Sequence, residues 1–133
     1  MRSYGSEISI KSSKRNELID VTAQIEKIVK ESGAKEGICF VFCPHTTAAV
    51  TINENADPSV KEDLLAGLSR LVPEHGNYSH SEGNSDAHIK SSLIGASVLL
   101  PVKNGSLVLG AWQGIFFCEF DGPRSRKLMV LVK

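Results

Sequence analysis

The chain has 133 residues, of which 41% are hydrophobic and 23% are charged. This length and composition are typical of one globular domain spanning residues 1–133, and they exclude a disordered chain and a membrane-spanning one. Fifteen basic residues balance fifteen acidic residues, so no net charge would hold the protein on nucleic acid or on an anionic membrane.

The first elements in chain order are two short strands and a helix. Apolar and polar residues alternate over 7–11, and an apolar pair stands at 18–19, which favours strand structure at both places. The helix is expected to begin at Thr22, as its cap, and to stop at Gly33. Its apolar residues recur with helical spacing: Val21, Ile25, Ile28 and Val29.

A continuous apolar run over 38–43 predicts a central strand that is covered on both faces. A further strand is expected over 48–53. Asp57 and Pro58 then provide an N-cap and a first-turn proline for a second helix, which Pro73 closes. This helix should bury one apolar stripe, made of Val60, Leu64, Leu65, Leu68, Leu71 and Val72.

Polar residues fill 74–88, which predicts a loop, and a short helix from about 86 to 94 should stop at Gly95. Strands dominate the rest of the chain. Their expected segments are 97–102, 106–109, 115–121 and 126–132, with turns at Asn104-Gly105 and at Gly122-Pro123. This mixture of helices and strands predicts an α+β fold.

Three cysteines, Cys39, Cys43 and Cys118, lie in apolar runs. An odd number of cysteines in such surroundings favours reduced, buried thiols over a disulfide framework. A metal site at the first two is the less favoured alternative, because their spacing matches no zinc motif. Residues 1–10 contain no apolar core of signal-peptide length. We therefore expect a cytoplasmic protein.

Imidazoles and carboxylates alternate in the segment HSEGNSDAH, which begins at His80 and ends at His88. Neutral imidazole suits zinc and similar ions, and carboxylates can bind the ion or orient the rings. A solvated loop without metal is the alternative for this segment alone. His45 follows the apolar run over 38–43, where it either adds a third imidazole to the site or merely caps the strand end. His75 is expected to be a surface histidine.

A second polar cluster follows the strand predicted at 115–121. Its period-two geometry sets Glu119 and Asp121 on one face with two large apolar side chains. If that face is buried, Arg124 or a metal is the expected counter-charge of the two carboxylates. If the face is exposed to water, the two carboxylates are no indication of a site. Gln113 either binds a ligand or satisfies a turn. Helix capping explains Asp57, but nothing local explains the neighbouring Glu54.

These motifs together resemble the YjbQ family, also called UPF0047 and described as secondary thiamine-phosphate synthase-like proteins. The segments that carry the resemblance are PHTTA at 44–48, NENADP at 53–58, YSHSEGNSDAH at 78–88, LGAWQ at 109–113 and EFDGPR at 119–124. The resemblance implies a curved, mainly antiparallel sheet packed with two or three helices, and a homotrimer with sites near the subunit boundaries. It also implies a divalent metal, with zinc as the first expectation.

The resemblance further assigns roles to residues of this chain. The expected metal ligands are His45, His80 and His88. The expected catalytic residues are Glu54, Asp121 and Arg124. The expected substrate-binding residues are Thr46, Thr47, Asn84, Asp86, Gln113 and Glu119.

Two functions of different classes remain from the sequence. The first is a metal-dependent enzyme that acts on a small phosphorylated or anionic metabolite, with Glu54 or Asp121 as base and thiamine-phosphate synthesis as a side activity. The second is a non-catalytic trimer that binds a metal or an anion. Nucleic-acid binding is disfavoured by the balanced charge.

Overall fold

The computed structural model describes residues 3–133, so the first two residues of the predicted domain lie outside it. Strands form most of the regular structure, as expected. In chain order the elements are β1 (Tyr4–Lys11), β2 (Glu17–Asp20), α1 (Thr22–Ser32), β3 (Glu36–Phe42), β4 (Ala48–Glu54), α2 (Pro58–Leu71), α3 (Ser85–Ile94), β5 (Ser97–Lys103), β6 (Ser106–Leu107), β7 (Gln113–Glu119) and β8 (Ser125–Val132).

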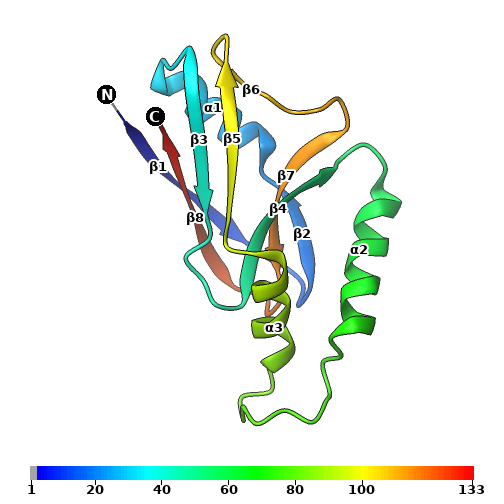
Figure 1. Ribbon diagram of the computed structural model, residues 1–133. Helices are drawn as coiled ribbons and strands as arrows, with labels where there is room; N and C mark the ends of the chain where they lie inside the picture. The colour runs from blue at the N-terminus through cyan, green and yellow to red at the C-terminus, as the bar shows by residue number, and fades with distance from the viewer. Residues whose placement is uncertain (1–2) are drawn as a thin grey trace.

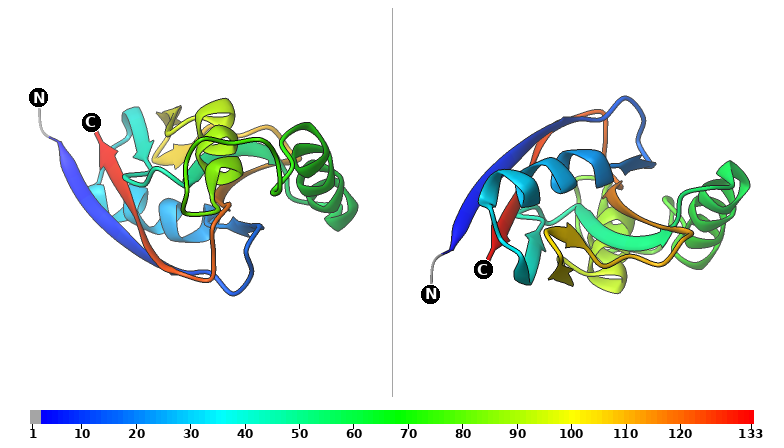
Figure 2. Two further views of the ribbon diagram at one scale, coloured as in Figure 1. Left: turned by 90° about the horizontal axis from the view of Figure 1, so that it is seen from below. Right: turned by 90° about the horizontal axis from the view of Figure 1, so that it is seen from above.

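The strands form two antiparallel sheets. The larger has the order β1-β8-β3-β5-β6 and the smaller the order β2-β7-β4. Figures 1 and 2 show that the larger sheet is strongly curved, with β1 and β8 bending around α1. The turn at Gly122-Pro123 carries the chain from β7 in the small sheet to β8 in the large one. The α+β class and the curved antiparallel sheet are therefore confirmed.

The main core lies between the two sheets, with α1 packed into it. Val21, Ile25, Ile28 and Val29 of the α1 segment contact inward-facing residues of both sheets. The helix begins at Thr22, but its cap lies one residue earlier than expected. Val21 is the N-cap, and Thr22 instead accompanies Asp20, whose Oδ1 accepts hydrogen bonds from the Thr22 backbone N–H and hydroxyl. Gly33 ends the helix in the left-handed conformation, as predicted.

The strand that is covered on both faces is β7, not β3. Every residue from Gly114 to Asp121 is buried, because α1 and the large sheet cover one face while α2 and α3 cover the other. In β3 only alternate residues point inward, and Ile38 and Phe42 are 44% and 37% exposed. The prediction for 38–43 was right about a central position in the sheet but wrong about its outer face.

The second helix is held less firmly than its apolar stripe predicts. Asp57 caps α2 and Pro58 opens it, as expected, but no residue of the helix is fully buried. Leu64, Leu65 and Leu68 are partly buried against the small sheet, whereas Leu71 is 77% exposed. The buried stripe was therefore wrong at Leu71, whereas the neighbouring Val72 is buried as predicted.

The predicted hairpin turn and the reduced thiols are confirmed, whereas two strands end earlier than expected, β6 at Leu107 and β7 at Glu119. Asn104 and Gly105 both have positive φ, as a tight two-residue hairpin turn between β5 and β6 requires. The three cysteines are free and buried, and burial raises the pKa of the Cys39 thiol to about 11. Among residues 3–133, none of the helices is both long enough and apolar enough to cross a membrane.

Candidate functional site

Most of the predicted site residues converge on one open cavity of about 440 Å³ at the end of β3. The loop after β3, the loop before α3, α3 itself and the β7–β8 turn supply its walls, near the lower end of the large sheet in Figure 1. The lining consists of the predicted residues His45, Thr46, Thr47, His80, Asn84, His88, Asp121 and Arg124, together with Pro44, Glu82 and Arg126.

A buried ion pair forms the floor of this cavity. Nε of Arg126 donates to Oε1 of Glu119 at 2.9 Å, and the hydroxyl of Ser12 donates to the same oxygen at 2.7 Å. Arg126 also donates to the hydroxyl of Thr47 at 2.8 Å. Burial alone would raise the pKa of Glu119, but the hydrogen bonds from Arg126 and Ser12 lower it overall. Glu119 is therefore a charged structural support that the cavity does not reach.

Asp121 is the carboxylate that does face the cavity. Its Oδ2 accepts hydrogen bonds from Nδ2 of Asn84 and from a guanidinium nitrogen of Arg124, each at 2.9 Å. A guanidinium nitrogen of Arg15 lies 3.5 Å from Oδ1. Burial opposes ionisation of Asp121, yet these donors lower its pKa overall. The carboxylate is therefore held ionised and oriented.

Gly122 allows this arrangement because its backbone lies directly against the β1–β2 loop. A Cβ at this position would stand 2.2 Å from the carbonyl oxygen of Lys14 and 2.9 Å from Cγ of Glu119. The Gly122 N–H also donates to the carbonyl oxygen of Arg15 at 3.0 Å. Only glycine fits here, and its fit brings Asp121 beside Arg15.

Two of the three predicted metal ligands lie close together. The imidazole rings of His80 and His88 meet edge to face with centroids 5.3 Å apart, and Nε2 of His80 lies 3.8 Å from a carboxylate oxygen of Glu82. These are suitable donors for a divalent ion. However, within residues 3–133 no three His, Cys, Asp or Glu side chains are already arranged around a common metal position. The donor types fit a metal, but a complete ligand set is not preformed.

His45 lines the same cavity but already has a partner. Its Nε2 lies 2.9 Å from the backbone nitrogen of Lys127, which donates a hydrogen bond to it. The ring stands edge-on to Phe117, with centroids 6.5 Å apart. Burial, followed by the nearby charge of Arg126, lowers the pKa of His45. This contact supports the alternative that His45 caps the strand end, and its expected role as a metal ligand stays a prediction.

Helix α3 is fixed behind the cavity by buried charges. Asp86 is completely buried and accepts a 2.9 Å hydrogen bond from Arg15. Nζ of Lys90, one turn further along the helix, lies 3.6 Å from Asp86 and donates to Oδ1 of Asn16 at 3.1 Å. Burial lowers the pKa of Lys90. Asp86 thus ties the helix that carries His88 to the β1–β2 loop, and it does not line the cavity.

The structure does not bring Glu54 and Gln113 to this cavity. They pair with each other across β4 and β7, at the opposite end of the ladder from the pair Ala48–Glu119. Six residues of strand separate the two ends, which corresponds to about 20 Å. Oε1 of Gln113 accepts the Gly110 N–H at 2.8 Å, so this side chain satisfies a turn. His75 is exposed, as expected.

Sequence reasoning missed the two arginines that organise the site. Arg126 is the counter-charge of Glu119, a role that was expected of Arg124 or a metal. The alternation of inward-facing residues in β8 could have indicated Arg126, because it continues the inward-facing positions of Leu128 and Val130. Arg15 had no such signal, since it lies in a loop and meets residues more than 60 positions away only through the fold.

Comparison with known proteins gives consistent results. The family model described as UPF0047 protein YjbQ-like matches residues 6–133. The UPF0047 protein MJ1081 of Methanocaldococcus jannaschii is 56% identical over 123 residues, covering 92% of this chain and 89% of that protein. The UPF0047 protein YugU of Bacillus subtilis is 53% identical over 120 residues, covering 90% of this chain and 91% of that protein.

Solved structures resemble this one over nearly their whole length. A YjbQ/UPF0047 family protein of Clostridium acetobutylicum has a TM-score of 0.95 at 53% identity, covering 96% of this chain and 99% of that one. A protein of unknown function from Sulfolobus solfataricus has a TM-score of 0.96 at 36% identity, covering 98% of this chain and 96% of that one. The sequence and the fold agree: this chain belongs to the UPF0047 family of YjbQ-like proteins.

Proposed function

We propose that the cavity at the end of β3 is the active site of a metal-dependent enzyme that acts on a small phosphorylated or otherwise anionic metabolite. The observation that carries this proposal is the convergence of three imidazoles, the carboxylate of Asp121 and the guanidinium of Arg124 on one open cavity. These groups come from segments far apart in the sequence. A concave site with several converging polar and titratable side chains is the usual place of an active site.

His80 and His88 are the residues that would hold the metal, with the Glu82 carboxylate as the nearest further donor. Zinc is the first expectation, because imidazole and carboxylate donors suit it. When bound, a divalent ion supplies a Lewis acid that stabilises negative charge on a substrate oxygen or a leaving group.

Arg124 is proposed to bind the anionic group. Its side chain is 52% exposed although Asp121 holds it in place, so its free guanidinium edge remains open to the cavity. An arginine fixed in this way presents planar donors that match a phosphate or a carboxylate. Asp121 itself, with its lowered pKa, suits orientation better than proton abstraction.

A non-catalytic trimer that binds a metal or an anion is the second candidate. The absence of a preformed three-ligand metal site among residues 3–133 favours it, because binding alone places a weaker demand on geometry than catalysis does. This candidate predicts affinity for zinc or phosphate without turnover.

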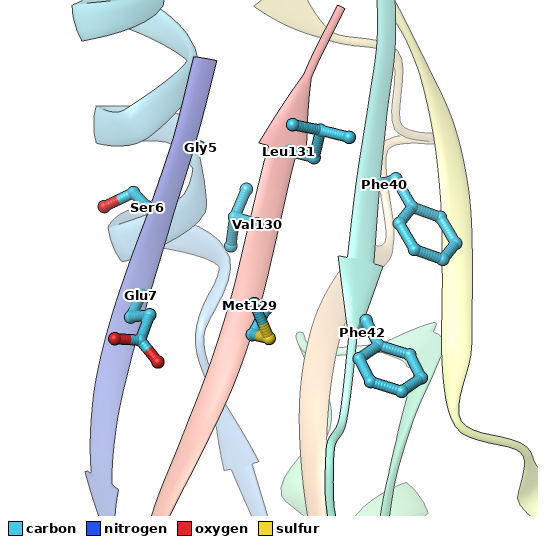
Figure 3. Close-up of a pocket in the computed structure, with 8 residues that line it drawn as sticks. All are labelled: Gly5, Ser6, Glu7, Phe40, Phe42, Met129, Val130 and Leu131. Atoms are coloured by element: carbon cyan, nitrogen blue, oxygen red, sulfur yellow. The ribbon is translucent and has the colours of Figure 1, made fainter. Parts of the chain in front are cut away.

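Self-association is proposed to use the outer face of the large sheet. Figure 3 shows Phe40 and Phe42 of β3 beside Met129 and Leu131 of β8. These residues line a groove of about 590 Å³. Leu99 of β5 is 60% exposed on the neighbouring strand. An apolar patch of this kind on a sheet is unfavourable in water, and head-to-tail contact with another surface of a neighbouring copy would cover it in a closed ring. A homotrimer is the assembly that we propose.

Thiamine-phosphate synthesis is proposed only as a side activity of this site. That reaction joins a pyrimidine methyl pyrophosphate to a thiazole phosphate and releases pyrophosphate. Two anionic substrates and an anionic leaving group would suit Arg124 together with a metal. The three buried free thiols support a reducing compartment, and the cytoplasm is the location that we propose.

The test is turnover by zinc- or manganese-reconstituted protein on a panel of phosphorylated metabolites that includes these two substrates. We expect conversion of at least one compound, with loss of turnover in Arg124→Ala. Arg70→Ala is the matched control, because that arginine is exposed on α2 away from the cavity. A fully metal-loaded protein that converts nothing but still binds phosphate would leave the binding protein as the function.

A further inference from the structure

The end of β3 explains why His45 occupies its position. Phe42 is the last residue of β3 and pairs with Met129 of β8. The same register continued by two residues would set Pro44 opposite Lys127. The chain instead turns away, and the imidazole of His45 takes the Lys127 N–H in place of a strand carbonyl. The ring therefore completes the edge of the sheet at the point where the cavity opens.

This contact determines which ring nitrogen carries the hydrogen. A backbone N–H can only donate, so Nε2 of His45 must present its lone pair to Lys127, and Nδ1 is the protonated nitrogen of the neutral ring. Nε2 also lies 3.2 Å from the carbonyl oxygen of Lys127. That longer contact would need a hydrogen on Nε2, which would collide with the Lys127 N–H already directed at the same nitrogen.

Using His45 as a metal ligand would disrupt this arrangement in either of two ways. Ligation through Nε2 would leave the Lys127 N–H without an acceptor at the edge of the sheet. Ligation through Nδ1 would require its hydrogen to move to Nε2. Neither cost applies to His80 and His88, because the Lys127 N–H is taken by His45 and the recorded polar contact on this side is that of Nε2 of His80 with Glu82, at 3.8 Å.

We infer that the β8 backbone holds His45 as the Nδ1–H tautomer, so that His45 is a hydrogen-bond donor to an anionic ligand in the cavity rather than a metal ligand. The inference rests on the proposed anion-binding role of the cavity. It divides the site into two parts. His80 and His88 form the metal side, while His45 and Arg124 provide donors on the anion side.

The experiment is long-range proton–nitrogen NMR on the full-length protein labelled with ¹⁵N-histidine. Spectra are recorded for the metal-free protein, then with zinc alone, and then with inorganic phosphate alone. Signals are assigned with His45→Gln, His80→Gln and His88→Gln, and the exposed His75 is the internal control. The ring nitrogens report protonation and metal ligation separately, so the readout does not depend on activity.

We expect His45 to show a protonated Nδ1 and an unprotonated Nε2 in the metal-free protein. Zinc should shift the ring nitrogens of His80 and His88 and leave those of His45 unchanged, whereas phosphate should shift Nδ1–H of His45. His45→Gln should keep the wild-type zinc stoichiometry, because its amide oxygen can still accept the Lys127 N–H.

Three results would overturn the inference: an Nε2–H tautomer in the metal-free protein, a zinc-induced shift of either His45 nitrogen, or a phosphate titration that leaves His45 unmoved. Failure of the proposed metal function looks different. In that case zinc would shift no histidine at all, while the tautomer of His45 and its response to phosphate would still decide its own role.

Discussion

Nε of Arg126 donates a 2.9 Å hydrogen bond to Oε1 of Glu119, a carboxylate with no exposure to solvent. The pair joins β7 of the small sheet to β8 of the large sheet directly below the candidate site. Glu119 is also tied to the β1–β2 loop through Ser12. This single carboxylate therefore connects three parts of the fold around the cavity.

Glu119→Gln should destabilise the protein by about 3–5 kcal/mol, because it leaves the charge of Arg126 buried without its partner. Urea unfolding followed by circular dichroism measures this free energy. Glu62→Gln is the control, since Glu62 is exposed on α2 and its substitution should change stability by less than about 0.5 kcal/mol. Equal stabilities of the two variants would show that the buried pair contributes nothing.

The protein should lose stability in acid through Glu119 and Asp121. Both folded-state pKa values lie below the ordinary values of 4.5 and 3.8. Stabilisation by these groups is therefore complete above about pH 4.5 and is lost as the pH falls through the lowered values. Unfolding free energies measured from neutral pH down to about pH 3 test this. Asp121→Asn should reduce the slope, and an unchanged slope would contradict the assignment.

Arg15→Ala should lower stability by about 1–3 kcal/mol, since it removes a hydrogen-bond donor from the fully buried Asp86. The loss should also loosen the attachment of α3, which carries His88. Hydrogen exchange of the α3 amides measures this loosening. Arg70→Ala, an exposed change on α2, serves as the control. If α3 is equally protected in both variants, Arg15 does not hold the helix.

A charged substitution on the outer face of the large sheet should disrupt assembly, whereas one on α2 should not. Light scattering should give the wild type three times the 14.4 kDa mass of one chain. Leu99→Glu should reduce this mass to that of the monomer, because a charge would be buried in the contact. Leu71→Glu, at an even more exposed leucine on α2, should leave the trimer intact. A monomeric wild type would contradict the trimer, and dissociation by Leu71→Glu alone would place the contact elsewhere.

Local patterns were sufficient to predict most of the elements and much of the cavity. The Asn104-Gly105 turn, the Gly33 stop and the Asp57 cap each depend on residues close in sequence, and each prediction was correct. Burial was harder to predict. The apolar runs at 38–43 and 115–118 look alike, and only the packing of α2 and α3 decides which one is covered twice.

The same limit applies to the candidate site. The histidine-rich segment and the strand-end His45 were visible as chemistry, and they lie around one cavity. Glu54 and Gln113 were grouped with them by resemblance, but strand register places both at the far end of β4 and β7. Arg15 reaches Asp86 only because a loop folds back across the chain, and no local pattern encodes such a contact.

His80 and His88 are proposed to hold a metal in this cavity. The zinc content of purified protein, measured by inductively coupled plasma mass spectrometry for the wild type, His88→Ala and the control His75→Ala, tests this. We expect close to one zinc per chain in the wild type and in His75→Ala, and little in His88→Ala. A wild type that stays metal-free after incubation with zinc, or a His88→Ala variant that keeps its metal, would show that these histidines do not hold the ion.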